Sequence, residues 1–361
     1  MSRVLMLVNG LGLGNSTRCH AVIERLRAAG AEIEMVTSDN GLWFFGDQPE
    51  IGRVTAIPSP RYGEKDGRIS IKATLAQAGA MIETLRRAEA IVTDTIDRFR
   101  PAVVVSDSTY ALRPVRRAGL PLAALNNSDM VVRRMKDGGW PWAVLPQFLV
   151  VEAADYLFHR TLPDLVISPR LDPADDAEAG RFRRVGPIVR AACRPAPPRT
   201  GRPERVVVML SGSVFGSPVA LRRSRPGLTI DVLGRPAPSG GPIPGGVTYH
   251  GKVRDSLALM RNADLVVING GFSAVSEALV LRKPMVVIPV PRHAEQWANG
   301  ETIRRLGLGL GADEDGLEEA IDAALGWIEV FRAGYAALPA LADGAGRAAE
   351  LILALAAGSR P

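Results

Sequence analysis

The stretch that decides the fold is Asn269-Gly-Gly-Phe-Ser-Ala-Val-Ser-Glu277. It follows an apolar run at 263–268 and precedes a second one at 285–289, so the predicted order is strand, glycine turn, helix, strand. At such a turn, backbone N–H groups and the positive end of the helix point toward a ligand. The pattern predicts an anion site at Gly270 and Gly271, with Ser273 or Ser276 capping the helix or binding the anion.

An acid in the first turns of this predicted helix indicates a nucleotide. Glu277 can accept hydrogen bonds from the vicinal hydroxyls of a ribose, so the stretch predicts a nucleotide-diphosphate site. Two structural alternatives stay open. The glycines could form only a strand-to-helix turn, and Glu277 could be a solvated helix residue.

The same alternation of strands and helices occurs in both halves of the chain. In the first half, an apolar run at 3–8 precedes a glycine loop and a helical pattern, and another at 101–106 ends at Asp107. The Pro-, Arg- and Gly-rich residues 190–204 form a predicted linker, after which the pattern restarts. We therefore expect an α/β protein with two Rossmann-like domains that face each other across a cleft. The predicted segments are 1–189 (N-terminal domain), 190–204 (linker), 205–335 (C-terminal, nucleotide-binding domain) and 336–361 (a helical segment that packs back on the N-terminal domain).

Composition narrows the function classes. The 361 residues are 47% hydrophobic and carry a formal net charge of +6, but the arginines are scattered among acids, so no nucleic-acid partner is expected. Cys19 and Cys193 are too few for a disulfide framework, and no Cys/His cluster has zinc spacing, so no metal is expected. The sequence shows no signal peptide and no apolar stretch of membrane-spanning length, which predicts a cytoplasmic location.

Several spaced motifs together resemble GT-B fold glycosyltransferases. They are Gly10-Leu-Gly-Leu-Gly14 with Thr17-Arg18, the run 101–107, Arg184-Val-Gly-Pro-Ile188, the stretch 270–277, Lys283-Pro284, and His293-Ala-Glu-Gln296 with Asn299. The pattern is most similar to the family 28 group, which includes bacterial peptidoglycan N-acetylglucosaminyltransferases and little-characterised archaeal and bacterial relatives. The resemblance implies transfer of a sugar from a nucleotide-diphosphate sugar, most simply a UDP-sugar, to a small-molecule or lipid-linked acceptor. It also implies that the configuration at the anomeric carbon is inverted, and that no cofactor or metal is needed besides the nucleotide-sugar co-substrate.

The resemblance also implies site residues. On the donor side they are Ser211, Gly212, Ser213, Val253, Gly270, Gly271, Ser273, Ser276, Glu277, His293, Glu295 and Gln296. On the acceptor side they are Gly12, Gly14, Asn15, Arg18 and Asp129. Ser211 to Ser213 would line the diphosphate or sugar, the loop at Val253 would lie by the base, and Glu295 and Gln296 would contact sugar hydroxyls. His293 could equally be a surface histidine, and Glu295 could simply favour a helix N-terminus.

The sequence departs from the family pattern at one position that matters for catalysis. Asn15 stands where the family commonly has a histidine, the usual candidate for the general base, and asparagine cannot take up a proton near neutral pH. Asp107, at a predicted strand end, is the remaining candidate, although it could instead cap a helix that runs on to Arg117. The base may thus lie elsewhere, the substrate may supply it, or activity may be lost. The alternatives to a transferase are a nucleotide-sugar hydrolase and a non-catalytic nucleotide-sugar-binding accessory protein.

A region with basic and aromatic residues predicts peripheral contact with a membrane. Arg133, Arg134 and Lys136 precede Trp140 and Trp142, so the region from Arg133 to Trp142 could rest on the inner face of an anionic membrane. The alternative is a loop whose aromatic side chains pack on the N-terminal domain or shape an acceptor pocket.

Overall fold

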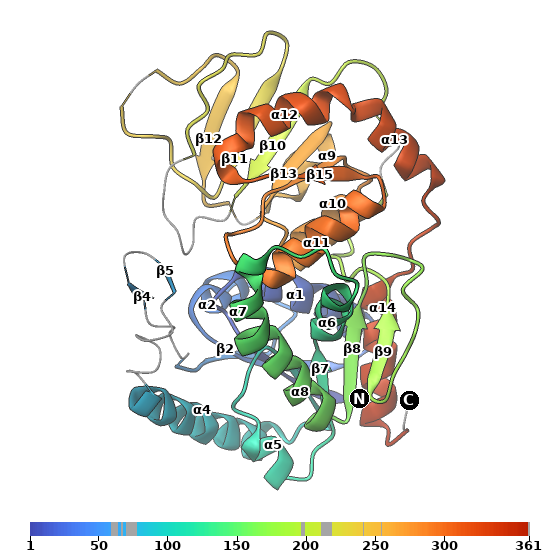
Figure 1. Cartoon of the computed structure of the whole chain (residues 1–361). Coiled ribbons are helices and arrows are strands. Elements are labelled where there is room, and N and C mark those ends of the chain that lie inside the picture. Colours follow the sequence, from blue (N-terminus) through green and yellow to red (C-terminus); the bar gives the residue numbers. More distant parts are fainter. Residues whose placement is uncertain are drawn as a thin grey trace.

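The chain folds into two α/β domains stacked one on the other, as the computed structural model shows (Figure 1). The structure describes residues 1–58, 64–65, 68–69, 78–195, 199–210, 219–240, 242–253 and 255–359. Each domain has a sheet whose strands all run parallel, with helices on both faces. The predicted fold class, two Rossmann-like domains, is confirmed.

The N-terminal sheet has the strand order β3-β2-β1-β6-β7-β8-β9. Its strands are β1 (Arg3–Val8), β2 (Glu32–Thr37), β3 (Arg53–Ala56), β6 (Val103–Asp107), β7 (Leu122–Leu125), β8 (Leu165–Pro169) and β9 (Phe182–Val185). The order reverses between β1 and β6, and open parallel sheets bind ligands at the carboxyl ends of the strands at such a point. Residues β4 (Glu64–Lys65) and β5 (Arg68–Ile69) form a separate antiparallel pair.

Helices and helical turns flank this sheet. They are α1 (Leu13–Ala28), α2 (Asp39–Phe45), α4 (Ala78–Phe99), α5 (Arg113–Arg117), α6 (Ser128–Lys136), η1 (Trp142–Val144), α7 (Leu145–Gln147), η2 (Phe148–Glu152), α8 (Ala153–Thr161) and α14 (Gly344–Ala356). The segment η2 is a single π-helical turn between α7 and α8.

The C-terminal sheet has the order β12-β11-β10-β13-β14-β15, and its switch point lies between β10 and β13. The strands are β10 (Arg205–Met209), β11 (Thr229–Leu233), β12 (Val247–Gly251), β13 (Leu265–Ile268), β14 (Met285–Val287) and β15 (Gly309–Gly311). The helices are α9 (Leu257–Asn262), α10 (Phe272–Val280), α11 (Ala294–Arg305), η3 (Glu314–Gly316), α12 (Leu317–Gly326) and α13 (Ile328–Ala337).

Strand β1 shows why continuous apolar runs form central strands here. Val4, Met6 and Val8 belong to one hydrophobic cluster, whereas Leu5 and Leu7 belong to another on the opposite face of the sheet. Because successive strand side chains point to opposite faces, a run that is apolar at every position can be buried on both. The carboxyl end of such a strand is thereby held rigidly at the sheet edge.

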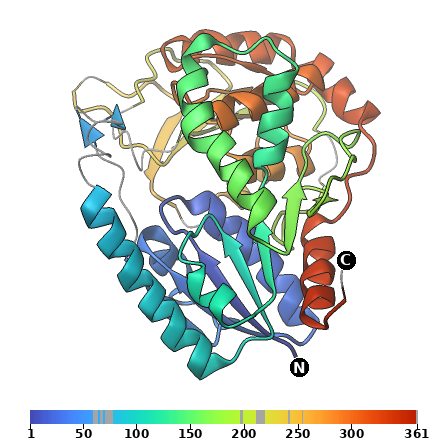
Figure 2. The ribbon, with the colours of Figure 1, turned by 60° about the horizontal axis from the view of Figure 1, so that its bottom comes forward.

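The last helix crosses back to the N-terminal domain. Apolar residues of α14, among them Leu351 and Ile352, join the same cluster as β1 and α1, and Figure 2 shows this helix beside the N-terminal sheet. The chain crosses between the domains twice, near Gly186 and near Ala342, and these two segments pack closely. A Cβ added at Gly186 would lie only 2.2 Å from the carbonyl oxygen of Ala342. The interdomain connection is therefore a pair of segments in contact.

One local prediction needs correction. The helix expected directly after Asp107 begins only at Arg113, as the short α5, and Asp107 is the last residue of β6. Asp107 therefore does not cap that helix. Between β10 and β11, the described residues 219–228 contain no helix. Among the described residues no helix is both long and apolar enough to cross a membrane.

Candidate functional site

The turn before α10 has the geometry of an anion site. Gly270 has φ +84°, and a Cβ there would lie 2.7 Å from the carbonyl oxygen of Gln296 and 2.8 Å from Val287 Cγ1, so only glycine fits. Asn299 Nδ2 donates to the Gly270 carbonyl oxygen at 2.9 Å and fixes the turn. Gly271 is the N-cap of α10, has no side-chain cap, and faces open space. The first N–H groups of α10 are thus available to a ligand.

The glycine loop of the N-terminal domain meets this turn. Ser273 Oγ donates to the carbonyl oxygen of Gly14 at 2.7 Å, so the first turns of α1 and α10 touch across the domain boundary. Gly12 is the exposed, uncapped N-cap of α1. The Ser16 and Ser276 hydroxyls are fully buried with no hydrogen-bond partner, and neither Ser273 nor Ser276 caps α10. The predicted donor and acceptor loops are therefore brought together.

Glu277 is buried but not isolated. Arg190 Nε donates to Glu277 Oε1 at 2.7 Å, and Arg190 Nη2 donates to Oε2 at 3.1 Å. Arg190 belongs to the segment that connects the domains and also pairs with the exposed Asp255 at 2.9 Å. A ribose that binds Glu277 would have to share the carboxylate with this arginine or displace it.

Asp107 is locked inside the N-terminal domain. Arg18 Nε donates to Oδ2 at 2.9 Å and Nη2 to Oδ1 at 2.6 Å, and the Cys19 thiol donates to Oδ2 at 3.2 Å. The Asp107 side chain is 0% exposed. Burial and this carboxylate raise the pKa of Cys19, which keeps the thiol protonated. With both oxygens occupied and no solvent access, Asp107 is poorly placed to accept a proton from a substrate.

The other N-terminal candidates also have structural partners. Asn15 Nδ2 donates to the carbonyl oxygen of Asn9 at 3.3 Å. Asp129 accepts a hydrogen bond from Ser168 Oγ at 2.7 Å and forms a buried ion pair with Arg184. Asp129 thus joins α6 to β8 and β9 within the domain rather than facing a ligand as a free charge.

The start of α11 forms a polar contact with the N-terminal domain. Glu295 Oε1 accepts from Asn127 Nδ2 at 3.2 Å, and Gln296 Oε1 accepts from the N–H of Val290 at 2.8 Å. His293 is the N-cap, and its buried Nδ1 has no hydrogen-bond partner. Burial lowers the pKa of His293, although Glu295 opposes this, so the imidazole is neutral at neutral pH.

One acid at this boundary was missed by the sequence analysis. Glu152, the last residue of η2, is buried and accepts from Gln147 Nε2 at 2.9 Å. Gln147 Oε1 in turn accepts the N–H of Ala294, at the first turn of α11, at 2.9 Å. Burial, and then the neighbouring Glu295, raise the pKa of Glu152 to about 8. The only signal in the sequence was a single acid at the end of the apolar run 148–151.

Of the remaining donor candidates, one lies in the described part of the chain. Val253 follows β12 and packs on the C-terminal core. Next to it, Lys252 Nζ donates to Asn40 Oδ1 at 2.8 Å and lies 4.2 Å from the ring centroid of Trp43, in the opposite domain. Ser211, Gly212 and Ser213 lie outside the described residues.

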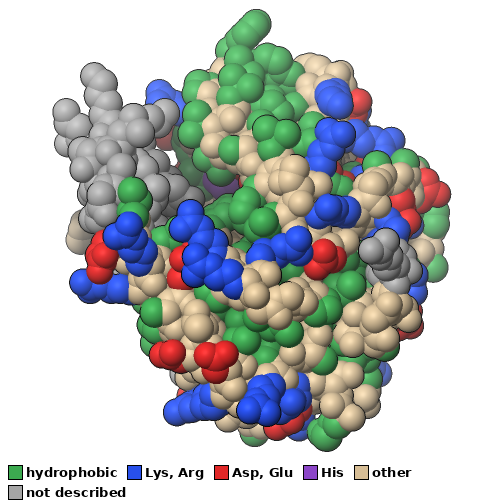
Figure 3. Space-filling view, turned by 90° about the horizontal axis from the view of Figure 1, so that it is seen from below, with side chains coloured by type: hydrophobic (Ala, Val, Ile, Leu, Met, Phe, Trp, Pro, Cys, Tyr) green, Lys and Arg blue, Asp and Glu red, His purple; other side chains and the backbone are tan. Residues whose placement is uncertain are grey.

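The region from Arg133 to Trp142 divides in two. Trp140 packs in a small cluster between the domains that contains Val131, Met135, Ala294 and Ala298. Trp142, by contrast, is 79% exposed. Leu149, Val150 and Leu157, on the helical turns that follow, are exposed as well. Hydrophobic side chains gather at the top of the face drawn in Figure 3.

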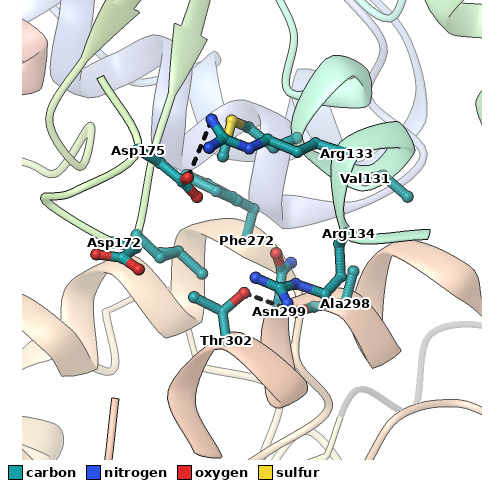
Figure 4. A pocket seen from close by; sticks show the side chains of 11 residues that line it. Val131, Arg133, Arg134, Asp172, Asp175, Phe272, Ala298, Asn299 and Thr302 are labelled. Carbon is teal, nitrogen blue, oxygen red and sulfur yellow. Dashed lines mark hydrogen bonds and ion pairs between the residues drawn. The ribbon is translucent and has the colours of Figure 1, made fainter. Parts of the chain in front are cut away.

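A pocket also opens between the domains, and it is not the predicted site. It is lined by residues of α6, the β8–β9 connection, α10 and α11, among them Arg134, Asp172, Phe272 and Thr302 (Figure 4). On its wall, Arg133 Nη1 pairs with Asp175 Oδ1 at 3.1 Å. The pocket touches the predicted site at Phe272, the first residue of α10, and at Asn299, which donates to the Gly270 carbonyl oxygen.

Comparison with known proteins places this geometry in a family. A model of the family described as "Glycosyl transferase family 1" matches residues 2–140 and 239–325. An uncharacterised glycosyltransferase of Methanosarcina acetivorans is 24% identical over 329 residues, which cover 85% of this chain and 84% of that protein. MurG of Acinetobacter baumannii has a TM-score of 0.59 at 14% identity, with 98% of this chain and 99% of that one covered.

A ligand-bound structure is also similar. SsfS6, a glycosyltransferase of Streptomyces sp. SF2575 complexed with thymidine diphosphate, has a TM-score of 0.57 at 20% identity, with 98% and 99% of the two chains covered. The GT-B resemblance of the sequence is confirmed, although the matching model is that of family 1 rather than family 28. The chain is a GT-B glycosyltransferase and belongs to glycosyl transferase family 1.

Proposed function

We propose that the chain transfers a sugar from a nucleotide-diphosphate sugar, bound at the start of α10, to an acceptor held by the N-terminal domain. The observation that carries this proposal is the uncapped N-terminus of α10, which opens at Gly271 directly opposite the glycine loop of α1. A helix N-terminus stabilises the negative charge that develops on a departing diphosphate. The bonds that would form and break then lie between the two domains.

Nearby side chains support specific roles for the rest of the donor. Glu277 would hold the ribose hydroxyls in place of, or together with, Arg190. Glu295 and Gln296 at the start of α11 would contact the sugar, with His293 beside them. The loop at Val253 would lie by the base. Because the helix N-terminus provides the positive potential, we propose that transfer is metal-independent, and a direct displacement would invert the anomeric centre. Similarity to a thymidine diphosphate complex supports dTDP as well as UDP as the nucleotide.

The acceptor is proposed to be a small molecule or a lipid-linked one. The exposed apolar side chains between Trp142 and Leu157 support peripheral contact with the inner face of an anionic membrane, because apolar side chains insert at the interface and the net charge is +6. The test is co-sedimentation with phosphatidylglycerol vesicles. Binding that is lost in Leu149→Ser supports the lipid-linked acceptor, and no binding leaves the small-molecule class.

The donor proposal is tested by calorimetric titration with UDP, dTDP, GDP and ADP. We expect selective binding of one or two nucleotides, weakened at least tenfold in Glu277→Ala. The matched control is Glu34→Ala, since Glu34 also forms a bidentate pair with an arginine, Arg98, but lies on β2 of the N-terminal sheet. Binding of none of the four would contradict the donor site and favour a non-catalytic role. Turnover with water that no added hydroxyl-bearing acceptor accelerates would favour the hydrolase.

A further inference from the structure

We propose that Glu152 is the general base of the transfer reaction and takes the proton of the acceptor hydroxyl. This inference rests on the proposed glycosyl transfer, and it fills the role that Asn15 cannot perform. It places the base on the π-helical turn η2 rather than on the glycine loop. Single π-helical turns are frequent at functional sites, because the extra residue redirects a side chain.

The position of Glu152 carries the argument. The side chain of Gln147 links Glu152 to the start of α11. It donates to the Glu152 carboxyl and accepts a hydrogen bond from the N–H of Ala294, the first residue of that helix. Phe148 of η2 packs in one cluster with Ala294 of α11, which brings the two elements together from opposite domains. The charge of Glu295, also on α11, helps to raise the pKa of Glu152. Glu295 is on the proposed donor side, whereas Glu152 is on the acceptor side. A hydroxyl that enters between the domains would therefore meet the carboxyl of Glu152.

The surroundings leave Glu152 available to exchange a proton. Among the described residues it forms no ion pair, and its hydrogen-bond partner is the neutral amide of Gln147. Of the charged groups on packed elements, Asp155 of α8 and Glu295 of α11 both favour the protonated form. On α6, Asp129 pairs with Arg184, Arg133 with Asp175 and Arg134 with Asp137, and the remaining charge is Lys136, the last residue of the helix. A carboxyl with a pKa of about 8 is well matched to base catalysis near neutral pH.

The other candidates are less suited. Asp107 has both oxygens bound by Arg18. His293 has an unpaired Nδ1, but it lies on the donor domain and burial lowers its pKa, which makes it a weaker base than Glu152. The two would also differ in pH dependence, with a rate limb near pH 8 for Glu152 and below pH 6.5 for His293.

The step balances as an inverting displacement. The acceptor oxygen forms a bond to the anomeric carbon while its proton passes to the Glu152 carboxylate. The bond from the anomeric carbon to the diphosphate oxygen breaks, and its electron pair leaves with the nucleoside diphosphate at the α10 N-terminus. Glu152 then returns the proton to solvent. No oxidant, reductant or further reactant is required.

The test measures release of nucleoside diphosphate from UDP-glucose and dTDP-glucose, with water as acceptor, against pH. The wild-type rate should rise with pH to a plateau above about 8. Glu152→Gln keeps an oxygen that can accept from Gln147. It should lower the plateau rate about a hundredfold or more and abolish the rise of the rate with pH, with nucleotide affinity unchanged. Glu152→Asp should lose rate but keep a limb. The control Asp155→Asn removes a neighbouring carboxylate on the following helix. It should keep the limb and move it slightly below 8, because the charge of Asp155 makes the smallest of the contributions that raise the pKa of Glu152.

Three outcomes would overturn the proposal. They are turnover of Glu152→Gln within threefold of wild type, a limb that persists in that variant, and a wild type that binds nucleotide without hydrolysing either donor. A limb below pH 6.5 that disappears in His293→Gln would assign the base to His293. If neither UDP nor dTDP binds the wild type at all, it is the proposed function that fails.

Discussion

Two arginine–carboxylate pairs lie at the edges of the two domains, and they differ in what surrounds them. Arg18 and Asp107 are side by side within the N-terminal domain, with side chains 6% and 0% exposed. Arg190 reaches Glu277 from the interdomain connection, is 13% exposed, and has a second partner in Asp255, which is 62% exposed. The first pair is closed to ligands, whereas the second can exchange a partner. A cleft-edge carboxylate is therefore a binding group only if its arginine can be satisfied elsewhere.

The largest expected effect comes from breaking the closed pair. Asp107→Ala leaves a buried, unpaired guanidinium and should lower the free energy of unfolding by about 3–5 kcal/mol. Glu277→Ala should lower the free energy of unfolding by only about 1 kcal/mol, because Arg190 would still pair with Asp255 and is partly exposed to solvent. Urea unfolding of both variants measures the difference. Equal losses would mean that the two pairs are not distinct in the way described.

The next effect concerns two neighbouring glycines of the C-terminal turn. Gly270→Ala combines a positive φ with contacts below 3 Å to Gln296 and Val287, and should cost about 2–4 kcal/mol. Gly271→Ala meets no atom within 4 Å and should cost less than about 1 kcal/mol. Thermal or urea unfolding separates the two. Gly271→Ala should nevertheless weaken nucleotide binding, because its methyl group lies over the α10 N-terminus.

The smallest effect is a pH dependence of stability. Between 4.5 and about 8 the folded protein keeps a proton on Glu152 that the unfolded chain has lost. Stability therefore falls as pH rises through this window, by at most about 1.4 kcal/mol per pH unit from this group. Glu152→Gln should gain stability relative to wild type by about 1 kcal/mol between pH 7 and 8. A constant difference across this range would show that Glu152 is ionised in the folded state.

Local sequence signals predicted the C-terminal turn well and the N-terminal site poorly. An apolar run followed by two glycines and a short helix defines its own geometry, so strand β13, the turn and α10 were expected near where they occur. Asp107 looked accessible because its partner, Arg18, is 89 residues away, and no local pattern shows such a pairing.

Glu152 escaped prediction for a related reason. Its relevance depends on Gln147, on a π-helical turn and on α11, which comes from the other domain. The short strands β3, β9 and β15 were also not predicted, because they are three or four residues long and lie at or near sheet edges. Long-range pairing rather than local propensity forms them.

The most direct test of the account is a crystal structure of the chain with UDP or dTDP bound, whichever binds tighter. We predict the diphosphate at the N–H groups that follow Gly271, the ribose hydroxyls on Glu277, and Arg190 shifted toward Asp255. The Arg18–Asp107 pair should be unchanged. A nucleotide bound in the pocket beside Arg134, or elsewhere with Glu277 still held by Arg190 alone, would contradict the account.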